Sequence, residues 1–302
     1  MVDRRDRLTS TQMATFVAAG FLRFDALVPD ELNHAAMREL EQGLQGAPAG
    51  TPLAQAYPAS STIGRVLRLP EIQGIIASLV GPDPLFDHHA VHVRAAAESH
   101  AQPLHADAII DTRLPFDIQL MYYPHDVPLE MGGTLLVPGS HLRRINETDI
   151  GRYQNVRGQI PLVCAAGTVL ALHHGLWHCG RQNKTGRTRY MFKVRLNPTV
   201  RQVRLWNTDD LDDPEIPRIL AQRYPWYEQA TGRLEIVNRS KLWRFLIGDD
   251  TYDTDYWLTR LENTPQTLYR ARYADTAHEF VRETFYCQGP KVTNGYDTGA
   301  FR

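Results

Sequence analysis

Thr168-Val169-Leu170-Ala171-Leu172-His173 and Arg189-Tyr190-Met191-Phe192-Lys193-Val194-Arg195 are two stretches that each predict a β-strand, the first nearly all apolar and the second alternating cations or Met with aromatic and branched residues. The polar stretch Gln182-Asn183-Lys184-Thr185-Gly186 lies between them and predicts a turn. Further short runs upstream predict strands at 89–95, 117–123 and 134–137, separated by Gly132-Gly133 and Pro138-Gly139-Ser140. Many short strands punctuated by Gly and Pro predict a β-sandwich or β-barrel.

The residues before this region, from about 9 to 88, predict mostly helix. Thr9-Ser10-Thr11 can cap a helix that ends near Gly20, and residues 21–24 then predict a short strand. A second helix is expected from Pro29, with apolar residues at four-residue steps. Residues 46–62 are rich in Gly, Ala, Pro, Ser and Thr, which predicts a mobile loop.

The residues after it, from about 198 to 302, are aromatic and charged. Leu211-Asp212-Asp213-Pro214 predicts the start of a helix, and residues 277–285 predict another. We interpret Trp226, Trp243 and Trp257 as packing residues of this extension, which would cover the barrel or form a homodimer surface. Together the three regions predict one domain over 1–302: mainly β with flanking helices, with the barrel over about 89–197.

Composition limits the classes of protein. Lys plus Arg (33) and Asp plus Glu (34) nearly balance, so no basic field indicates nucleic-acid binding or an anionic membrane. No apolar run approaches the roughly 20 residues that span a bilayer, and the first residues do not resemble a signal peptide. Three widely spaced cysteines fit reduced thiols, which predicts a cytoplasmic protein. We expect the partner to be a small-molecule substrate rather than a nucleic acid or a membrane.

A metal site is predicted by strand alternation. His105 and Asp107 are two residues apart, so both side chains can reach the same point from one strand end. His178 would complete two imidazoles and one carboxylate, a set that covers one face of an iron(II) ion and leaves three positions open. Those positions can take a bidentate 2-oxo acid and O2. His173 and His174 remain alternatives to His178, although as residues flanking the barrel mouth they fit better.

Arg189 is the candidate for holding the distal carboxylate of the 2-oxo acid, since a guanidinium can pair two oxygens at once. Arg187 would face the same side of a regular strand, so alternation leaves both open. Thr134 can donate its hydroxyl to the same acid, and Gln119 lies on a strand face that would line the barrel if it points inward.

Two further cations share a strand face with Arg189. They are Lys193 and Arg195, and a core strand rarely buries such groups without partners. Either they meet an acidic substrate or they reach solvent at the end of the barrel; we favour the second.

These residues also carry a resemblance. Pro103-Leu104-His105-Ala106-Asp107, Glu130 to His141 (Glu-Met-Gly-Gly-Thr-Leu-Leu-Val-Pro-Gly-Ser-His) and Trp177 to Thr185, ending at Arg189, resemble the phytanoyl-CoA dioxygenase family of iron(II)/2-oxoglutarate oxygenases. The resemblance covers about residues 10 to 197 and implies a double-stranded β-helix, a jelly-roll barrel. It implies metal ligation by His105, Asp107 and His178, and it favours Arg189 over Arg187.

By this resemblance the protein would use Fe(2+), 2-oxoglutarate and O2 to hydroxylate a C–H bond of a small metabolite, with release of succinate and CO2. Cys179 and Arg181 depart from the residues often found after the distal histidine, which leaves the substrate open. A cupin-type hydrolase or isomerase using the same three ligands is the alternative.

Overall fold

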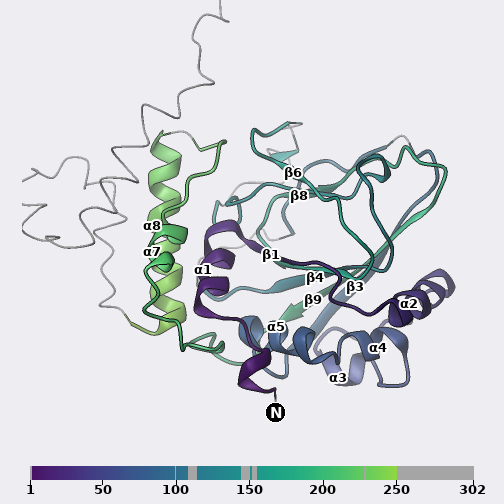
Figure 1. The fold of residues 1–302 in the computed structure, drawn as a ribbon, viewed down its shortest axis with the longest axis horizontal. Coiled ribbons are helices and arrows are strands. Elements are labelled where there is room, and N and C mark those ends of the chain that lie inside the picture. Colours follow the sequence, from purple (N-terminus) through teal and green to yellow (C-terminus); the bar gives the residue numbers. More distant parts are fainter. Residues whose placement is uncertain are drawn as a thin grey trace, which may run out of the picture.

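Two antiparallel sheets form the centre of the computed structural model, which describes residues 2–98, 100–107, 114–143, 150–151, 155–227 and 229–249 (Figure 1). The large sheet has the order β1-β7-β4-β9-β3-β2 and the small sheet the order β6-β5-β8. The strands are β1 (Phe21–Phe24), β2 (Thr51–Pro52), β3 (Leu85–Arg94), β4 (Ile118–Tyr123), β5 (Thr134–Leu136), β6 (Ile160–Pro161), β7 (Thr168–His173), β8 (His178–Gly180) and β9 (Arg189–Asn197).

Helices cover the face of the large sheet that points away from the small sheet (Figure 1). They include α2 (Asp30–Gln42), α3 (Leu53–Ala56), α4 (Thr62–Val66) and α5 (Pro70–Val80). On β4 the alternate residues Leu120 and Tyr122 join the core under these helices, whereas Met121 and Tyr123 join a second core inside the barrel. This arrangement confirms the predicted jelly-roll barrel with flanking helices.

The first helix, α1 (Ser10–Ala19), begins and ends where the sequence predicts. Thr9 and Gln12 form a capping box, and Gly20 ends the helix at φ 83°, a conformation that favours glycine. A Cβ at Gly20 would also lie 2.5 Å from the ring of His141. The glycine therefore allows the chain to turn directly from α1 into β1.

The loop prediction for residues 46–62 is wrong in its middle. Thr51–Pro52 form β2, which pairs with β3, and Leu53–Ala56 form α3. Gly50 donates its backbone N–H to Phe86 at 2.8 Å, so a partner distant in the sequence orders this segment. Local composition does not contain that information.

The C-terminal extension adds α7 (Glu215–Leu220) and α8 (Gln229–Ile247), which contact each other and α1 (Figure 1). Trp243 is buried, and its ring centre lies 5.9 Å from that of Trp206, in agreement with its interpretation as a packing residue. The helix expected at 277–285, Trp257 and most of the surface expected to form a dimer lie outside the described residues. Within the described part of the chain, no helix is both long and apolar enough to cross a bilayer.

Candidate active site

The two candidate histidine ligands lie side by side on directly paired backbones, with ring centres 4.5 Å apart. His105 and His178 pair as an isolated antiparallel bridge, with backbone N–H to carbonyl distances of 3.0 and 2.8 Å. His178 opens β8, while His105 follows Gln102, whose side chain and backbone both bond to Gly180. Backbone pairing, rather than side-chain packing alone, therefore sets the spacing of the two rings.

Each ring is held in one orientation by its own backbone. The Nδ1 of His105 lies 2.9 Å from the carbonyl oxygen of Pro103, and the Nδ1 of His178 lies 2.9 Å from that of Leu176. Because a carbonyl only accepts, each Nδ1 carries the proton, and the lone pair of the neutral ring is on Nε2. Histidines that bind metals commonly have this second hydrogen bond.

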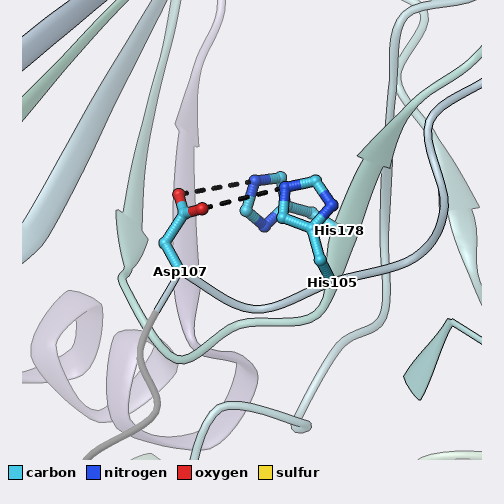
Figure 2. A group of neighbouring side chains, drawn as sticks. All are labelled: His105, Asp107 and His178. Carbon is cyan, nitrogen blue, oxygen red and sulfur yellow. Dashed lines mark ion pairs between the residues drawn. The ribbon is translucent and has the colours of Figure 1, made fainter. Parts of the chain in front are cut away.

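Both Nε2 atoms point at the carboxylate of Asp107 (Figure 2). The Nε2 of His105 lies 3.8 Å from Oδ1 and the Nε2 of His178 lies 3.8 Å from Oδ2. One ligand atom from each residue lies within 4.8 Å of the others. Two imidazole lone pairs and one carboxylate at this spacing fit a divalent transition metal.

The electrostatics of the site keep these donors in the state that binds metal. Burial lowers the pKa of His178 to about 4, so its ring is neutral at neutral pH. Burial opposes ionisation of Asp107, but attraction to His178 and Lys193 outweighs it and holds the pKa of Asp107 below its usual range. The site therefore presents an ionised carboxylate next to the neutral imidazole of His178.

A small pocket opens beside the two histidines. Its wall includes Arg189 and Thr134 as well as His105 and His178, and the remaining lining residues are His92, Gln102, Met121, Gly180, Met191 and Lys193. The hydroxyl of Thr134 lies 2.5 Å from that of Tyr123, which is fully buried. The pocket therefore brings a guanidinium, a hydroxyl and an ammonium to the side of the candidate ligands.

Arg189 is buried in this wall, with 2 % of its surface exposed. Within the described residues its guanidinium has one long hydrogen bond, from NH1 to the carbonyl of Met131 at 3.5 Å, while its Nε has no partner. Burial lowers the pKa of Arg189 from its usual value. Arg187, by contrast, is exposed, so the structure separates the two residues that alternation leaves equivalent.

The other residues considered as site candidates or neighbours are buried but do not line the pocket. Gln119 is fully buried on β4, but it is not among the residues that line the cavity. His173 and His174 are buried in the barrel wall, where the Nδ1 of His174 contacts the backbone of Asp117, and neither joins the three candidate ligands. Cys179 is buried in a small apolar cluster.

The prediction that Lys193 and Arg195 reach solvent is wrong. Lys193 is 8 % exposed and its Nζ lies 3.1 Å from Oδ2 of Asp107. Arg195 is held by Asp117 at 2.8 Å. Both cations are thus tied to acidic partners inside the barrel mouth, as buried charges generally must be. Sequence reasoning also missed His92 and Gln102 as lining residues, since no motif marks them.

Comparison with known proteins assigns the family. The sequence model of the phytanoyl-CoA dioxygenase family matches residues 18–191, which is more than half of the chain. The chain belongs to this family, and the match includes His105, Asp107, His178 and Arg189 but ends before Lys193.

Individual relatives are more distant. An uncharacterized protein of Mycobacterium tuberculosis, Rv1501, is 26% identical over 121 residues, which are 39% of this chain and 43% of the relative; an uncharacterized protein of Mycobacterium bovis, Mb1539, matches equally. The chain thus spans less than half the length of the curated relatives it matches.

Among solved structures, HygX from Streptomyces hygroscopicus with iron bound is 18% identical, with a TM-score of 0.51 over 69% of this chain and 94% of HygX. HygX with nickel and 2-oxoglutarate bound gives a TM-score of 0.50 over 70% of this chain. At this level of identity the likeness concerns the fold.

Proposed function

We propose that this protein is an iron(II)- and 2-oxoglutarate-dependent dioxygenase that hydroxylates a C–H bond of a small-molecule metabolite. The observation that carries the proposal is the shared orientation of His105 and His178, whose Nε2 atoms both face the carboxylate of Asp107. Membership of the phytanoyl-CoA dioxygenase family supports the same chemistry.

In this proposal His105, Asp107 and His178 hold the metal. Bound iron(II) would supply the activation of O2, with 2-oxoglutarate consumed to succinate and CO2 and the substrate hydroxylated. The backbone carbonyls of Pro103 and Leu176 keep both Nε2 lone pairs aimed at the metal. Two of the three ligands therefore need no rearrangement when the metal binds.

Arg189 would bind the distal carboxylate of 2-oxoglutarate. Its buried guanidinium has few partners among the described residues, and a planar fork pairs both oxygens of a carboxylate. The hydroxyl of Thr134 would add a hydrogen bond from the same wall, held in place by Tyr123. Gln119, although farther from the wall, remains a weaker candidate for the same role.

The apolar part of the site would exclude water. Met121 and Met191 belong to the buried core inside the barrel and also line the cavity. A dry wall next to the charged groups strengthens every electrostatic contact with a bound acid. We propose that residues 1–302 act as one oxygenase domain built on this barrel.

The test follows succinate release with iron(II), ascorbate and 2-oxoglutarate, in air and without O2, for the wild type and for His178→Ala. His34→Ala is the control, because His34 is an exposed histidine of α2. We expect succinate that requires O2, disappears in His178→Ala and persists in His34→Ala. Failure of 2-oxoglutarate to bind at all would refute the oxygenase and favour a non-redox metalloenzyme of cupin type.

A further inference from the structure

Lys193 is the least expected charge of the site. It lies on β9 with its Nζ 3.1 Å from Oδ2 of Asp107, and its side chain is 10% exposed. It also lines the cavity together with Arg189. The proposed dioxygenase activity assigns roles to Asp107 and Arg189 but none to Lys193.

The acidic side chains that pair with the neighbouring cations are not candidate ligands. The guanidinium of Arg195 is held by Asp117 at 2.8 Å, and that of Arg94 by Glu98 at 2.6 Å. Lys193 differs, because its acidic partner is the carboxylate of Asp107, which would also bind the metal. A metal at Asp107 would weaken the pairing of a nearly buried ammonium, which is costly unless another anion compensates.

A charge count indicates which anions the site favours. Among the described residues, the cavity wall contributes two cations, Arg189 and Lys193, and the adjoining Asp107 contributes one anion. Iron(II) alone would leave this set with a large positive charge, and 2-oxoglutarate, as a dianion, would cancel the charge of the metal. Lys193 can therefore be neutralised by the metal-binding carboxylate of 2-oxoglutarate, and the one positive charge that remains in this largely buried place favours a further carboxylate.

We propose that Lys193 is the anion-recognising residue of this site and receives a carboxylate that a small-molecule ligand brings next to the metal. The inference rests on the proposed function, since it assumes a metal at Asp107. The carboxylate belongs either to the metal-binding end of 2-oxoglutarate or to an acidic prime substrate. Lys193 would thus select for acids over neutral compounds of the same shape.

A second buried polar group lies close to Lys193. In the pairing of β4 with β9, Gln119 lies opposite Arg195 and Met121 lies opposite Lys193, so Gln119 and Lys193 are diagonal neighbours. Gln119 is fully buried, and neither its side-chain nitrogen nor its oxygen has a partner among the described residues.

The charge of Lys193 predicts opposite effects on two ligands. It repels a divalent cation and competes with it for Asp107, but it attracts a dianion. Replacing Lys193 with Met keeps most of the stem and removes the charge. We therefore expect zinc(II) to bind tighter and 2-oxoglutarate to bind more weakly, each by on the order of tenfold or more.

The experiment uses isothermal titration of the full chain with zinc(II), and then of the zinc-loaded protein with 2-oxoglutarate. Lys193→Met and Lys193→Gln are compared with Lys193→Arg, which keeps the charge, and with Lys241→Met, which makes the same change at an exposed position of α8. We expect Lys193→Met and Lys193→Gln to bind zinc(II) more tightly and 2-oxoglutarate more weakly. Lys193→Arg and Lys241→Met should keep near-wild-type affinities for both ligands. Lys193→Gln preserves the test if Lys193→Met fails to fold.

A second arm identifies the source of the carboxylate. Hexanoate, hexanamide, phenylacetate and phenylacetamide are added separately to protein already loaded with zinc(II) and 2-oxoglutarate, and the melting temperature is measured. Stabilisation of the wild type by the acids but not by the amides, lost in Lys193→Met, assigns Lys193 to an acidic prime substrate. No preference for acids assigns it to 2-oxoglutarate alone, provided that the first arm gives the opposite shifts.

Three results would overturn the inference. Equal affinities of wild type and Lys193→Met for both ligands would remove any electrostatic role for Lys193. Weakening of both ligands together would indicate a merely structural role. A wild type that binds zinc(II) but not 2-oxoglutarate, or neither, would refute the proposed function and this inference with it, whereas the first two results leave the proposed function intact.

Discussion

Replacing Arg189 with Met should make the metal-free protein more stable and should weaken the binding of 2-oxoglutarate. The guanidinium is 2 % exposed, its Nε has no partner, and its one hydrogen bond within the described residues is 3.5 Å long. A buried charge with so little compensation costs free energy, and a well-packed apolar side chain avoids that cost. We expect Arg189→Met to raise the free energy of unfolding of the metal-free protein by about 1 kcal/mol.

The same substitution should nearly abolish co-substrate binding. Loss of one partner of a desolvated, hydrogen-bonded charge pair costs about 2–5 kcal/mol, which corresponds to a weakening of roughly 30-fold or more. Arg189→Lys keeps the charge but not the planar fork and should fall between Arg189→Met and the wild type.

Two assays separate these effects. Urea unfolding of metal-free protein measures stability, and titration of zinc-loaded protein with 2-oxoglutarate measures affinity. Arg187→Met is the control, because Arg187 is exposed and two residues away. The reasoning fails if Arg189→Met destabilises the empty protein by more than about 2 kcal/mol while binding 2-oxoglutarate like the wild type.

Three other substitutions test how the site is supported. Gly132→Ala should lower the free energy of unfolding in urea by about 2–4 kcal/mol, because Gly132 has φ 71° and a Cβ there would lie 1.9 Å from the carbonyl oxygen of Gln182; a change below 1 kcal/mol would contradict this. Asp210→Asn should cost about 1 kcal/mol at neutral pH. Burial opposes ionisation of Asp210, but hydrogen bonds from the N-terminal residues of α1 outweigh it and lower its pKa to about 2. The stabilisation is therefore complete above the unfolded value near 3.9 and is lost as the pH falls toward about 2, so unfolding at pH 7 and pH 3 should show a difference that shrinks in acid. Tyr123→Phe should cost about 1 kcal/mol in the same assay, since Tyr123 is fully buried against the hydroxyl of Thr134; an unchanged stability would mean that the hydrogen bond contributes nothing.

Much of the fold could be predicted because it is encoded locally. The capping box at Thr9 and Gln12, with Gly20 at the other end, marks α1 to within a residue. The apolar runs at 117–123, 168–173 and 189–195 correspond to β4, β7 and β9 within two residues at either end. These strands are buried on both faces, and continuous apolar runs are their usual sequence signature.

Elements that depend on distant partners were harder to predict. β2 exists because Thr51 and Pro52 pair with β3, more than 30 residues later, and nothing in their own composition favours a strand. The jelly-roll topology likewise came from the resemblance rather than from the strands. A set of strands is compatible with several orders, and only the pairing selects one.

The candidate site divides in the same way. Alternation predicts that His105 and Asp107 reach one point, and the structure brings them together with His178, although their role as ligands stays a prediction. The choice between Arg187 and Arg189 needed the burial of each residue. The sequence could not predict the partner of Lys193, because the contact with Asp107 joins residues that are far apart in the chain.

The backbone bridge between His105 and His178 makes the site tolerant of some insertions and intolerant of others. Residues added to the connections between β4 and β7 need not move either ring, since paired backbones set the separation and the length of the intervening chain does not. One residue added between Leu176 and His178 would instead turn the imidazole to the opposite face of its strand. The outer segments of this barrel can therefore change length and composition while the proposed metal centre remains in place.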